Sequence, residues 1–357
     1  MRNPKELLRQ LATLEALLGN VPDPIVFVGA DGLVREANAA ARELLPALRF
    51  GQPLSFGVRA PEILDAVART SPGQSNFVDY YERVPTERTF DVQITWLPAD
   101  SGGGSENAGV MLFFRDLTAA RRLERMRVDF VANVSHELRT PLASLIGFIE
   151  TLQGSARQDP QVWDRFLEIM RGQAWRMTRL IDDLLSLSRI EMREHLPPKA
   201  LVDLHSLVEQ IIDTLTPTAA EHGVVIEFGT PQEPVTVLGD PDELLRVVEN
   251  LVENAVKYGQ SGGRVEVALT RSAKEIELSV RDHGPGIAHE YLPRLTERFY
   301  RVDVAASRDK GGTGLGLAIV KHIVNRHRGR LVIESEPGHG ALFRVILPAC
   351  DRSAEPL

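Results

Sequence analysis

The chain has 357 residues, which is enough for two or three domains that each bury a core of their own. It holds 41 basic and 49 acidic residues, so its net charge of −8 argues against direct binding to nucleic acid or to an anionic membrane surface. Cys350 is the only cysteine, which excludes an intramolecular disulfide and a cysteine-based metal site.

The sequence has no run of the roughly 18 to 20 uninterrupted apolar residues that a membrane-spanning helix needs. Residues 1–20 also lack the order of basic and apolar segments found in a signal peptide. We therefore expect a cytoplasmic protein. Membrane association is expected only if the gene product carries further segments before Met1.

The first part of the chain has the pattern of a small α+β domain, which we place at residues 8–117. Short runs of β-type residues alternate with turns, as in an antiparallel sheet. These runs occupy Ile25–Val28, Leu33–Glu36, Phe90–Trp96 and Val110–Phe114. The segment between the last two runs contains Gly102-Gly103-Gly104, a composition that favours a hairpin loop.

Residues 118–194 change to a helical period. Apolar side chains recur at spacings of three, four or seven on both sides of a break at Gly154–Pro160, which predicts two helices joined as a hairpin. Each helix would carry an apolar stripe wider than its single neighbour can cover. Two hairpins packed as a four-helix bundle cover both stripes, so we expect a homodimer.

Strands and helices alternate again over residues 201–348. Asp240-Pro241-Asp242-Glu243 combines an N-cap, a proline at the first helical position and a capping-box glutamate, and it predicts a helix that runs to Tyr258. The expected strands are Val224–Phe228, Arg264–Thr270, Glu275–Arg281, Leu331–Ser335 and Ala341–Leu347. This pattern predicts an α/β sandwich with helices on one sheet face, followed by a disordered tail at residues 349–357.

The first segment with candidate chemistry is Ser135–Leu142, inside the first hairpin helix. Its apolar residues face the core, so His136 falls on the exposed side, where an imidazole nitrogen can act as a nucleophile. Glu137 can accept a hydrogen bond from the other ring nitrogen, and Pro141 should bend the helix just beyond the histidine. Taken alone, a histidine on a helix is more often a solvated surface residue, and the segments further along the chain are what favour the nucleophile. A zinc-protease site is excluded because Thr140 occupies the place of its second histidine.

The second segment lies on the helix expected to end at Tyr258. Asn250 and Asn254 are four residues apart and share one helix face, and amide oxygens are suitable ligands for Mg²⁺ that already carries phosphate and water. Lys257 can reach a phosphate as a point charge. Because asparagine is a poor helix former, the pair favours a functional face. Two solvated asparagines are the alternative.

The third segment, Asp282–Ile287, stands at the end of an expected strand. Gly284 and Gly286 allow a flat ligand to approach the backbone closely, and the Asp282 carboxylate can accept a hydrogen bond from the amino group of adenine. The alternative is a turn built on glycine and proline with no ligand.

The fourth segment, Gly311–Leu317, leads into a helix, so its amides can bind phosphate groups with help from the helix dipole. It is not a Walker loop, because no Gly-Lys-Ser/Thr closes it, and it is not a dinucleotide fingerprint, because it does not follow a strand. Between the last two segments, Arg298–Arg301 and Asp303–Lys310 are expected to form a mobile lid over a nucleotide.

In this order and spacing, the segments resemble the H, N, first G, F and second G boxes of bacterial sensor histidine kinases, over residues 121–348. The resemblance implies a multidomain α+β protein whose last domain is an ATPase of the gyrase, chaperone, histidine kinase and MutL class. It implies ATP and Mg²⁺ as cofactors, and a response regulator whose aspartate receives the phosphoryl group. The residues implied in catalysis are His136, Glu137 and Thr140, with Asn250 and Asn254 on the metal. Those implied in nucleotide binding are Asn250, Asn254, Lys257, Tyr258, Asp282, Gly284, Gly286, Ile287, Gly312, Thr313, Gly314, Leu315 and Gly316.

The spacing His-Glu-x-x-Thr also resembles family members that dephosphorylate their regulator. Thr140 lies one helical turn after His136 on the same face, where its hydroxyl could orient a water toward an aspartyl phosphate. The alternative is that this hydroxyl bonds back to its own helix ahead of Pro141.

The first block resembles a PAS sensor domain at Asp31-Gly32, Glu36–Ala40 and Phe114–Leu117. All nine histidines lie at or after His136, so this block has neither histidine nor cysteine to hold haem iron, a flavin-cysteinyl adduct or an iron–sulfur cluster. Gly314–Arg330 is most similar to the phosphate-regulon group of sensor kinases, which implies a response to phosphate.

Two rival functions remain to be compared. Other ATPases of the same superfamily, such as chaperones, topoisomerase-type ATPases or serine kinases acting on anti-sigma partners, share the asparagine, aspartate and glycine segments but not the helical hairpin with His136. A non-catalytic scaffold would be expected to have lost Asn254, Asp282 or the glycines around Gly314, and all of these are present.

Overall fold

The computed structural model describes residues 6, 13, 16–82, 87–98, 108–154, 159–229, 235–303 and 312–350. The chain divides into two compact units, Met1–Val131 and Ala132–Leu357, and the boundary falls inside helix α4 (Thr118–Gln153). The glycine-rich loop before Gly109, most of the expected lid and the tail after Cys350 lie outside the described residues. Within the described ranges, none of the helices has both the length and the hydropathy of a membrane span.

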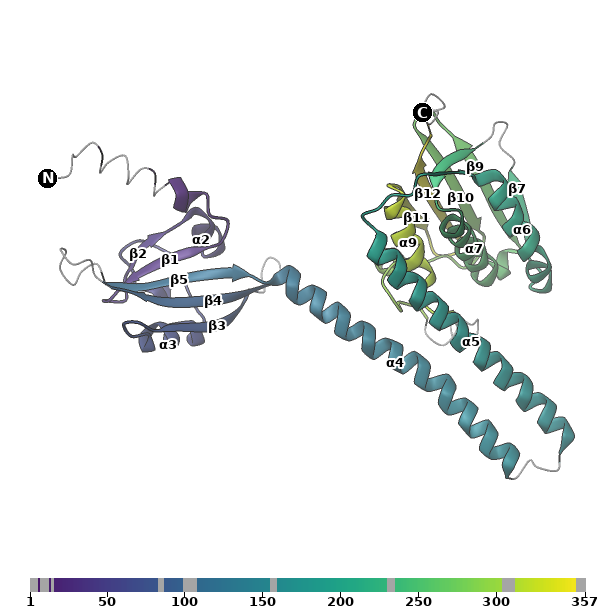
Figure 1. The fold of residues 1–357 in the computed structure, drawn as a ribbon, viewed down its shortest axis with the longest axis horizontal. Helices are drawn as coiled ribbons and strands as arrows, with labels where there is room; N and C mark the ends of the chain where they lie inside the picture. Colours follow the sequence, from purple (N-terminus) through teal and green to yellow (C-terminus); the bar gives the residue numbers. More distant parts are fainter. Residues whose placement is uncertain are drawn as a thin grey trace. The chain divides into compact units, whose positions relative to one another are not determined.

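The first unit is built on a five-stranded antiparallel sheet with strand order β2-β1-β5-β4-β3 (Figure 1). The strands are β1 (Ile25–Gly29), β2 (Val34–Ala37), β3 (Ser75–Glu82), β4 (Arg88–Leu97) and β5 (Gly109–Asp116). Helices α2 (Ala39–Leu44) and α3 (Pro61–Arg69) and the short turn η1 (Leu54–Phe56) lie between β2 and β3 in the chain. Alternate residues of β4 are fully buried, namely Phe90, Val92 and Ile94, and they form the centre of the core.

A buried asparagine joins the first helix of this unit to the sheet. The Asn38 side chain accepts hydrogen bonds from the backbone N–H of Ala41, at 2.9 Å, and of Ile25, at 3.0 Å. It therefore caps α2 and fixes the start of β1 with the same oxygen.

The last strand of the unit is tied to the beginning of α4. Asp116 Oδ1 accepts the backbone N–H of Thr118 at 2.8 Å, and Thr118 Oγ1 accepts the backbone N–H of Thr89, on β4, at 2.9 Å. The Arg88 guanidinium bonds to Asp116 Oδ2 at 2.8 Å. These bonds fix the first turn of α4 to the sheet.

The second unit begins with the expected helical hairpin, formed by the rest of α4 and by α5 (Pro160–Arg193). Asp159 caps α5 through the amides of Gln161 and Val162. The rings of Phe148 and Phe166 pack at 4.9 Å between centroids and join the two helices near their turn. Helix α4 continues through Pro141 as one element.

The rest of this unit confirms the expected α/β sandwich. Its five-stranded sheet has the order β11-β12-β10-β9-β7, in which only β7 and β9 are parallel. Helices α6 (Leu204–Glu221), α7 (Pro241–Tyr258) and α9 (Gly316–Arg326) cover one face (Figure 1). The strands are β7 (Val225–Gly229), β9 (Arg264–Arg271), β10 (Glu275–Asp282), β11 (Arg330–Ser335) and β12 (Ala341–Pro348), with a two-stranded sheet of β6 (Ala200–Asp203) and β8 (Thr236–Gly239) beside them. Short turns η3 (Gln260–Gly262) and η4 (His289–Arg294) complete the fold.

The start of α7 differs from the expected capping box in one respect. Asp240 caps the helix through the amides of Asp242 and Glu243, as predicted. The Asp240 N–H, however, donates to Nε2 of the buried His327 at 3.0 Å, and Glu243 pairs with Arg326 at 2.5 Å. His327, just after the end of α9, thus replaces the Glu243 side chain as the partner of the Asp240 N–H. Arg326, on α9, pairs with Glu243 instead, and the two contacts hold α7 against α9.

Candidate active site

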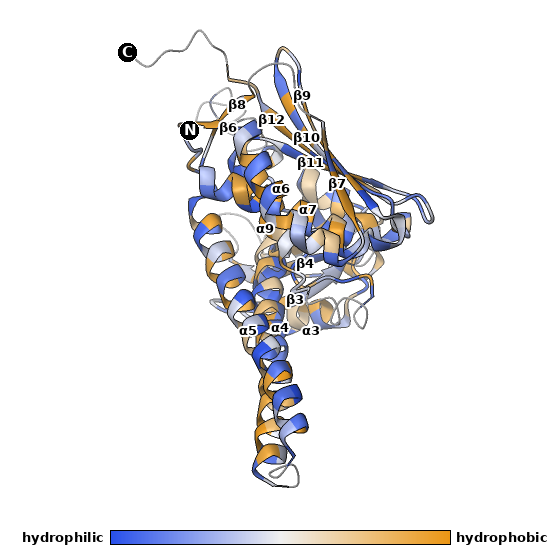
Figure 2. Cartoon of the chain, turned by 90° about the vertical axis from the view of Figure 1, so that its right-hand side faces the viewer, coloured by the Kyte–Doolittle hydropathy of each residue, from blue (hydrophilic) through white to orange (hydrophobic). Residues whose placement is uncertain are grey.

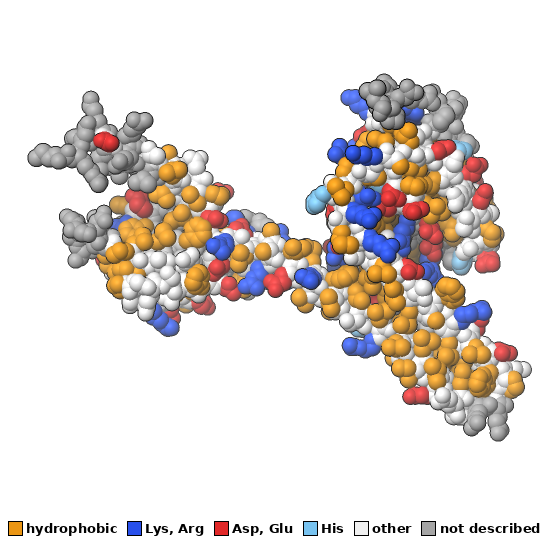
Figure 3. Space-filling model, in the orientation of Figure 1, with side chains coloured by type: hydrophobic (Ala, Val, Ile, Leu, Met, Phe, Trp, Pro, Cys, Tyr) orange, Lys and Arg blue, Asp and Glu red, His pale blue; other side chains and the backbone are white. Residues whose placement is uncertain are grey.

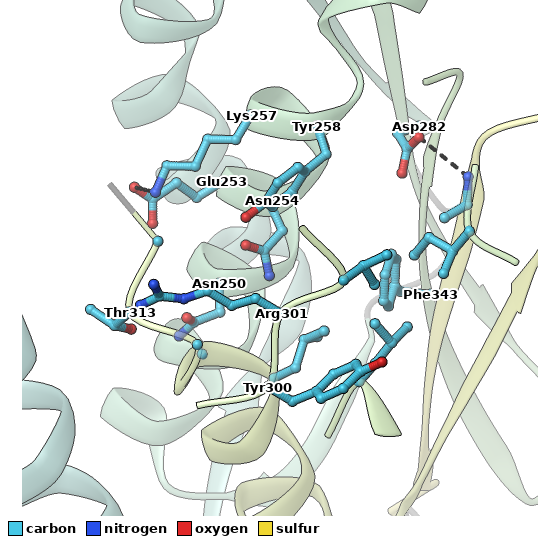
Figure 4. A pocket seen from close by; sticks show the side chains of 18 of the residues that line it. Asn250, Glu253, Asn254, Lys257, Tyr258, Asp282, Tyr300, Arg301, Thr313 and Phe343 are labelled. Atoms are coloured by element: carbon cyan, nitrogen blue, oxygen red, sulfur yellow. Dashed lines mark hydrogen bonds and ion pairs between the residues drawn. The ribbon is translucent and has the colours of Figure 1, made fainter. Parts of the chain in front are cut away.

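A cavity of about 540 Å³ opens between α7, the end of β10 and the loop before α9. Figure 4 shows Asp282 and Phe343 at one end and Lys257, Asn250, Thr313 and Arg301 at the other. The sequence-predicted residues that line it are Asn250, Asn254, Lys257, Tyr258, Asp282, Gly286, Ile287, Gly312, Thr313, Gly314 and Gly316. Gly284 and Leu315 do not line the cavity. The N–H of Gly284 bonds to Asp282, and Leu315 is fully buried.

Asp282 is fixed at its end of the cavity by the backbone. Asp282 is only 5% exposed. Its Oδ1 accepts the N–H of Gly284 at 2.9 Å and that of Ala341 at 3.2 Å. Burial raises the pKa of this carboxyl, and the two amide bonds oppose the rise. Because both bonds go to Oδ1, Oδ2 is the oxygen available to a ligand.

The two asparagines of α7 share the face that lines the cavity, because apolar residues of the same helix are buried behind them. Asn250 Nδ2 donates to the carbonyl of Arg246 at 2.8 Å, which orients its Oδ1 toward the glycine loop. A Cβ at position 316 would collide with that oxygen, so a larger residue there would push the Asn250 amide aside. Lys257 pairs with Glu253 at 2.7 Å, one turn back on the helix.

The glycine loop is held in a backbone conformation that favours glycine. Gly314 has φ of +73°, and its carbonyl accepts the N–H of Phe299 at 2.8 Å. The Thr313 hydroxyl accepts the N–H of Leu315 at 3.3 Å. The loop therefore presents its backbone to the cavity just before α9 begins.

Asp183 and Arg246, at the Thr313 end, were not among the sequence predictions, whereas Arg301 belongs to the segment expected to form a lid. Thr313 Oγ1 donates to Asp183 Oδ2, on α5, at 2.9 Å, and Arg246 donates to Asp183 Oδ1 at 3.1 Å. Arg301 also lines the cavity, and its side chain is only 5% exposed. The one sequence signal for Arg246 is its position a turn before Asn250 on the same helix face.

The histidine segment lies on α4, and Arg301 connects it to the cavity. His136 is exposed, as predicted. The Glu137 carboxylate accepts from Arg301 at 3.0 Å and from Arg176, on α5, at 3.4 Å. The Thr140 hydroxyl donates to the carbonyl of His136 at 3.2 Å, which is the back-bonding alternative considered for this threonine.

Two family models match the chain, one over most of the hairpin and one over the sandwich from Gly239 onward. The model described as the His Kinase A (phospho-acceptor) domain matches residues 126–193. The model described as the histidine kinase-, DNA gyrase B- and HSP90-like ATPase matches residues 239–351.

Among curated relatives, the phosphate regulon sensor protein PhoR of Pseudomonas aeruginosa is 36% identical over 327 residues, which are 90% of this chain and 71% of that protein. The sensor-like histidine kinase SenX3 of Mycolicibacterium smegmatis is 39% identical over 67% of this chain and 62% of its own length. The sensor protein kinase WalK of Staphylococcus saprophyticus is 38% identical over 67% of this chain. The matched part is only 39% of WalK, so that relative is much longer than the region it shares.

One solved structure resembles the fold across most of the chain. It is the histidine kinase ThkA in a complex with the response regulator protein TrrA, with a TM-score of 0.51 and 20% identity over 94% of this chain and 98% of that one. At this identity the likeness concerns the fold alone.

Proposed function

Because the chain belongs to the sensor histidine kinases of two-component systems, which are ATP-dependent enzymes, we propose that His136 is its phosphoacceptor. The observation that carries the proposal is that His136 is the only histidine within the matched residues 126–193. It is exposed, and its neighbour Glu137 is bonded to Arg301, which lines the nucleotide cavity. Membership in the family decides against the chaperone, topoisomerase and scaffold alternatives.

The cavity supports a definite orientation for ATP. The base would lie at the Asp282 end, where Oδ2 can accept a hydrogen bond from the amino group of adenine. The phosphates would lie among Lys257, Thr313 and the amides of the glycine loop (Figure 4). An adenine at Asp282 predicts that ATP binds more tightly than GTP.

Asn254 and Asn250 fit a magnesium ion bound together with the phosphates. Both line the cavity, and Asn250 keeps its Oδ1 toward the glycine loop, where Gly316 leaves room beside it. Amide oxygens are hard ligands of the kind that Mg²⁺ accepts. When bound, the ion supplies charge neutralisation of the phosphates.

The reaction can be written from the groups on the hairpin. A ring nitrogen of His136 attacks the γ-phosphorus, a phosphorus–nitrogen bond forms, and the bond between the γ-phosphorus and the bridging oxygen breaks to release ADP. Glu137 accepts a hydrogen bond from the other ring nitrogen, and this makes the attacking nitrogen more basic. Both arginine bonds of Glu137 are made to its Oε2. The phosphoryl group then passes to an aspartate of a response regulator. Thr140, on the same helix face as His136, takes part in the later removal of that group from the regulator.

The hairpin exposes an apolar surface that supports a homodimer. Figure 2 shows stretches of hydrophobic residues along the two hairpin helices, and Figure 3 shows hydrophobic side chains gathered on them. Those exposed within the second unit are Leu142, Ile146, Ile149, Trp163, Leu167, Trp175, Ile181, Leu185 and Met192. Their helical spacing continues the stripe expected from the sequence, and a second hairpin would cover it.

We assign residues 8–117 to a PAS-like sensor domain, 118–194 to the phosphoacceptor hairpin and 201–348 to the ATP-binding domain. The antiparallel sheet with α2 and α3 between its second and third strands supports the first assignment. The similarity to the phosphate regulon sensor PhoR supports phosphate as the signal.

The phosphoacceptor is tested with ATP labelled on its γ-phosphate. His136→Gln should abolish labelling and leave ATP affinity unchanged, and the wild-type label should be labile in acid and stable in base. His195→Gln is the matched control, because His195 is an exposed histidine just outside the matched hairpin residues. Labelling that persists in His136→Gln, or an acid-stable ester, contradicts the assignment.

A further inference from the structure

One carboxylate of the hairpin occupies the phosphate end of the cavity. Asp183, on α5, accepts hydrogen bonds from the Thr313 hydroxyl at 2.9 Å and from the Arg246 guanidinium at 3.1 Å. The side chains of Asp183 and Arg246 are 19% and 27% exposed. Asp183, Arg246 and Thr313 all line the cavity. An anion from the hairpin is thus already bound where the glycine loop meets α7.

The donors that hold Asp183 are of the kind that bind phosphate. A guanidinium forms strong, charge-assisted hydrogen bonds with either a carboxylate or a phosphate, and a hydroxyl beside a glycine loop donates to either anion. Arg246 lies one turn before Asn250, and Thr313 is within the loop that precedes α9. Both would therefore be within the part of the cavity assigned to the phosphates and their metal ion.

The surroundings make this contact easy to displace. Burial raises the pKa of Asp183, and its bonds to Thr313 and Arg246 oppose the rise, so the carboxylate loses hydration that the two donors restore only in part. Glu249 and Glu253 also line the cavity, and burial together with the charge of Glu253 raises the pKa of Glu249. A polyphosphate arriving here would meet the same donors and repel the carboxylate.

We propose that Arg246 is a ligand of the terminal phosphates of ATP and that Asp183 takes their place when α5 is docked, so that ATP binding and docking of the hairpin compete. The inference rests on ATP occupying this cavity. Binding of ATP would break the bonds of Asp183 and release the ATP-binding domain from α5. That release would allow the domain to carry the γ-phosphate toward His136 on α4.

Competition of this kind predicts a specific pattern of nucleotide affinities in the full-length chain with Mg²⁺. If the docked form dominates, the apparent affinity of the wild type is reduced by the fraction that is open. Asp183→Asn should therefore tighten ATP binding by about tenfold, and should tighten ADP binding less. Arg246→Gln should weaken ATP more than ADP, by about tenfold for ATP. In the double variant, Asp183→Asn should no longer tighten ATP, because the donor it releases is gone.

The control for charge is Asp164→Asn, which removes the same charge from an exposed side chain on the same helix, outside the residues that line the cavity. It should change ATP affinity by less than about twofold. Hydrogen exchange of α5 gives an independent readout of docking: the amides around Asp183 should lose protection when Mg-ATP is added to the wild type, and should lack this protection in Asp183→Asn without nucleotide.

The proposal is overturned if Asp183→Asn binds ATP no more tightly than Asp164→Asn, or if ATP leaves the protection of α5 unchanged. Failure of the proposed function gives a different result, because the wild type would then bind no ATP and Asp282→Asn would have no effect. Thermal unfolding of each variant separates a loss of the fold from a loss of a ligand contact.

Discussion

The two ends of the nucleotide cavity are held in different ways. At the base end, Asp282 is fixed by the backbone amides of Gly284 and Ala341. At the phosphate end, Thr313 and Arg301 are held by carboxylates of the hairpin. Amides in and beside a sheet keep their positions while the domain stays folded, whereas pairs of side chains on separate elements can exchange partners. The end proposed to bind the base is therefore a constant part of the domain, and the proposed phosphate end depends on the hairpin.

The largest effect should follow from removing the carboxylate that joins the phosphate end to the histidine. Glu137→Gln keeps the size of the side chain but cannot make the imidazole more basic, so autophosphorylation should slow by about a hundredfold. The rate is measured in a single turnover at saturating ATP. Arg176→Gln is the companion variant, because it removes one partner of Glu137 and leaves the carboxylate. If Glu137→Gln is as fast as the wild type, the carboxylate serves only to bind the two arginines.

A smaller effect is expected at the constant end. Asp282→Asn sets a donor against the amino group of adenine and leaves buried polar groups unpaired, which should cost about 2 kcal/mol, or roughly thirtyfold in ATP affinity. Calorimetric titration with ATP and GTP measures both the loss and the base preference. Asn254→Asp is the contrasting variant, since it should shift the Mg²⁺ dependence more than the binding of the base. Equal affinity of the wild type for ATP and GTP would remove the adenine assignment.

The constant end was also the part that sequence reasoning described best. The expected strands of the ATP-binding domain lie within two residues of β7, β9, β10, β11 and β12 at either end. Asp282 falls on the last residue of β10, and Asn250 and Asn254 lie on α7. These residues are placed by local signals, because a helix cap, a strand period and a glycine turn depend on near neighbours.

The phosphate end depends on contacts that local patterns do not carry. Asp183 and Thr313 are 130 residues apart, and their bond exists only because α5 packs near α9. The capping box shows the same limit of local patterns. Glu243 pairs with Arg326, and the Asp240 N–H is bonded by the buried His327, which is distant in the sequence. Strand β3 was not among the predictions either; its exposed face carries polar residues together with Phe77.

His327 makes the junction between the start of α7 and the end of α9 sensitive to acid. Burial lowers the pKa of His327 below its usual 6.5, and its Nε2 accepts the amide of Asp240 only while the ring is neutral. The unfolded chain therefore binds the proton first, so stability is complete above about pH 6.5 and is lost as pH falls below it. Thermal unfolding between pH 7.5 and 5.5 should show this loss. His327→Gln should flatten the dependence, while His339→Gln, at an exposed histidine, should keep the wild-type slope.

The smallest change is expected from Thr140→Ala, and it concerns the reverse direction of the chemistry. In the arrangement described here the Thr140 hydroxyl bonds back to the carbonyl of His136 at 3.2 Å, so it must turn outward to orient a water toward an aspartyl phosphate. Alanine removes the hydroxyl, keeps helix propensity and leaves the nucleophile in place. Autophosphorylation should therefore stay at the wild-type rate, while dephosphorylation of the regulator should slow by several-fold. The measurement follows decay of the phosphorylated regulator with the kinase and ADP present, and Thr178→Ala is the matched control, because Thr178 is an exposed threonine on α5 that makes the same bond to its own helix, at 3.2 Å to Ala174. A Thr140→Ala variant that removes phosphate as fast as Thr178→Ala would show that the hydroxyl only bonds back to its helix.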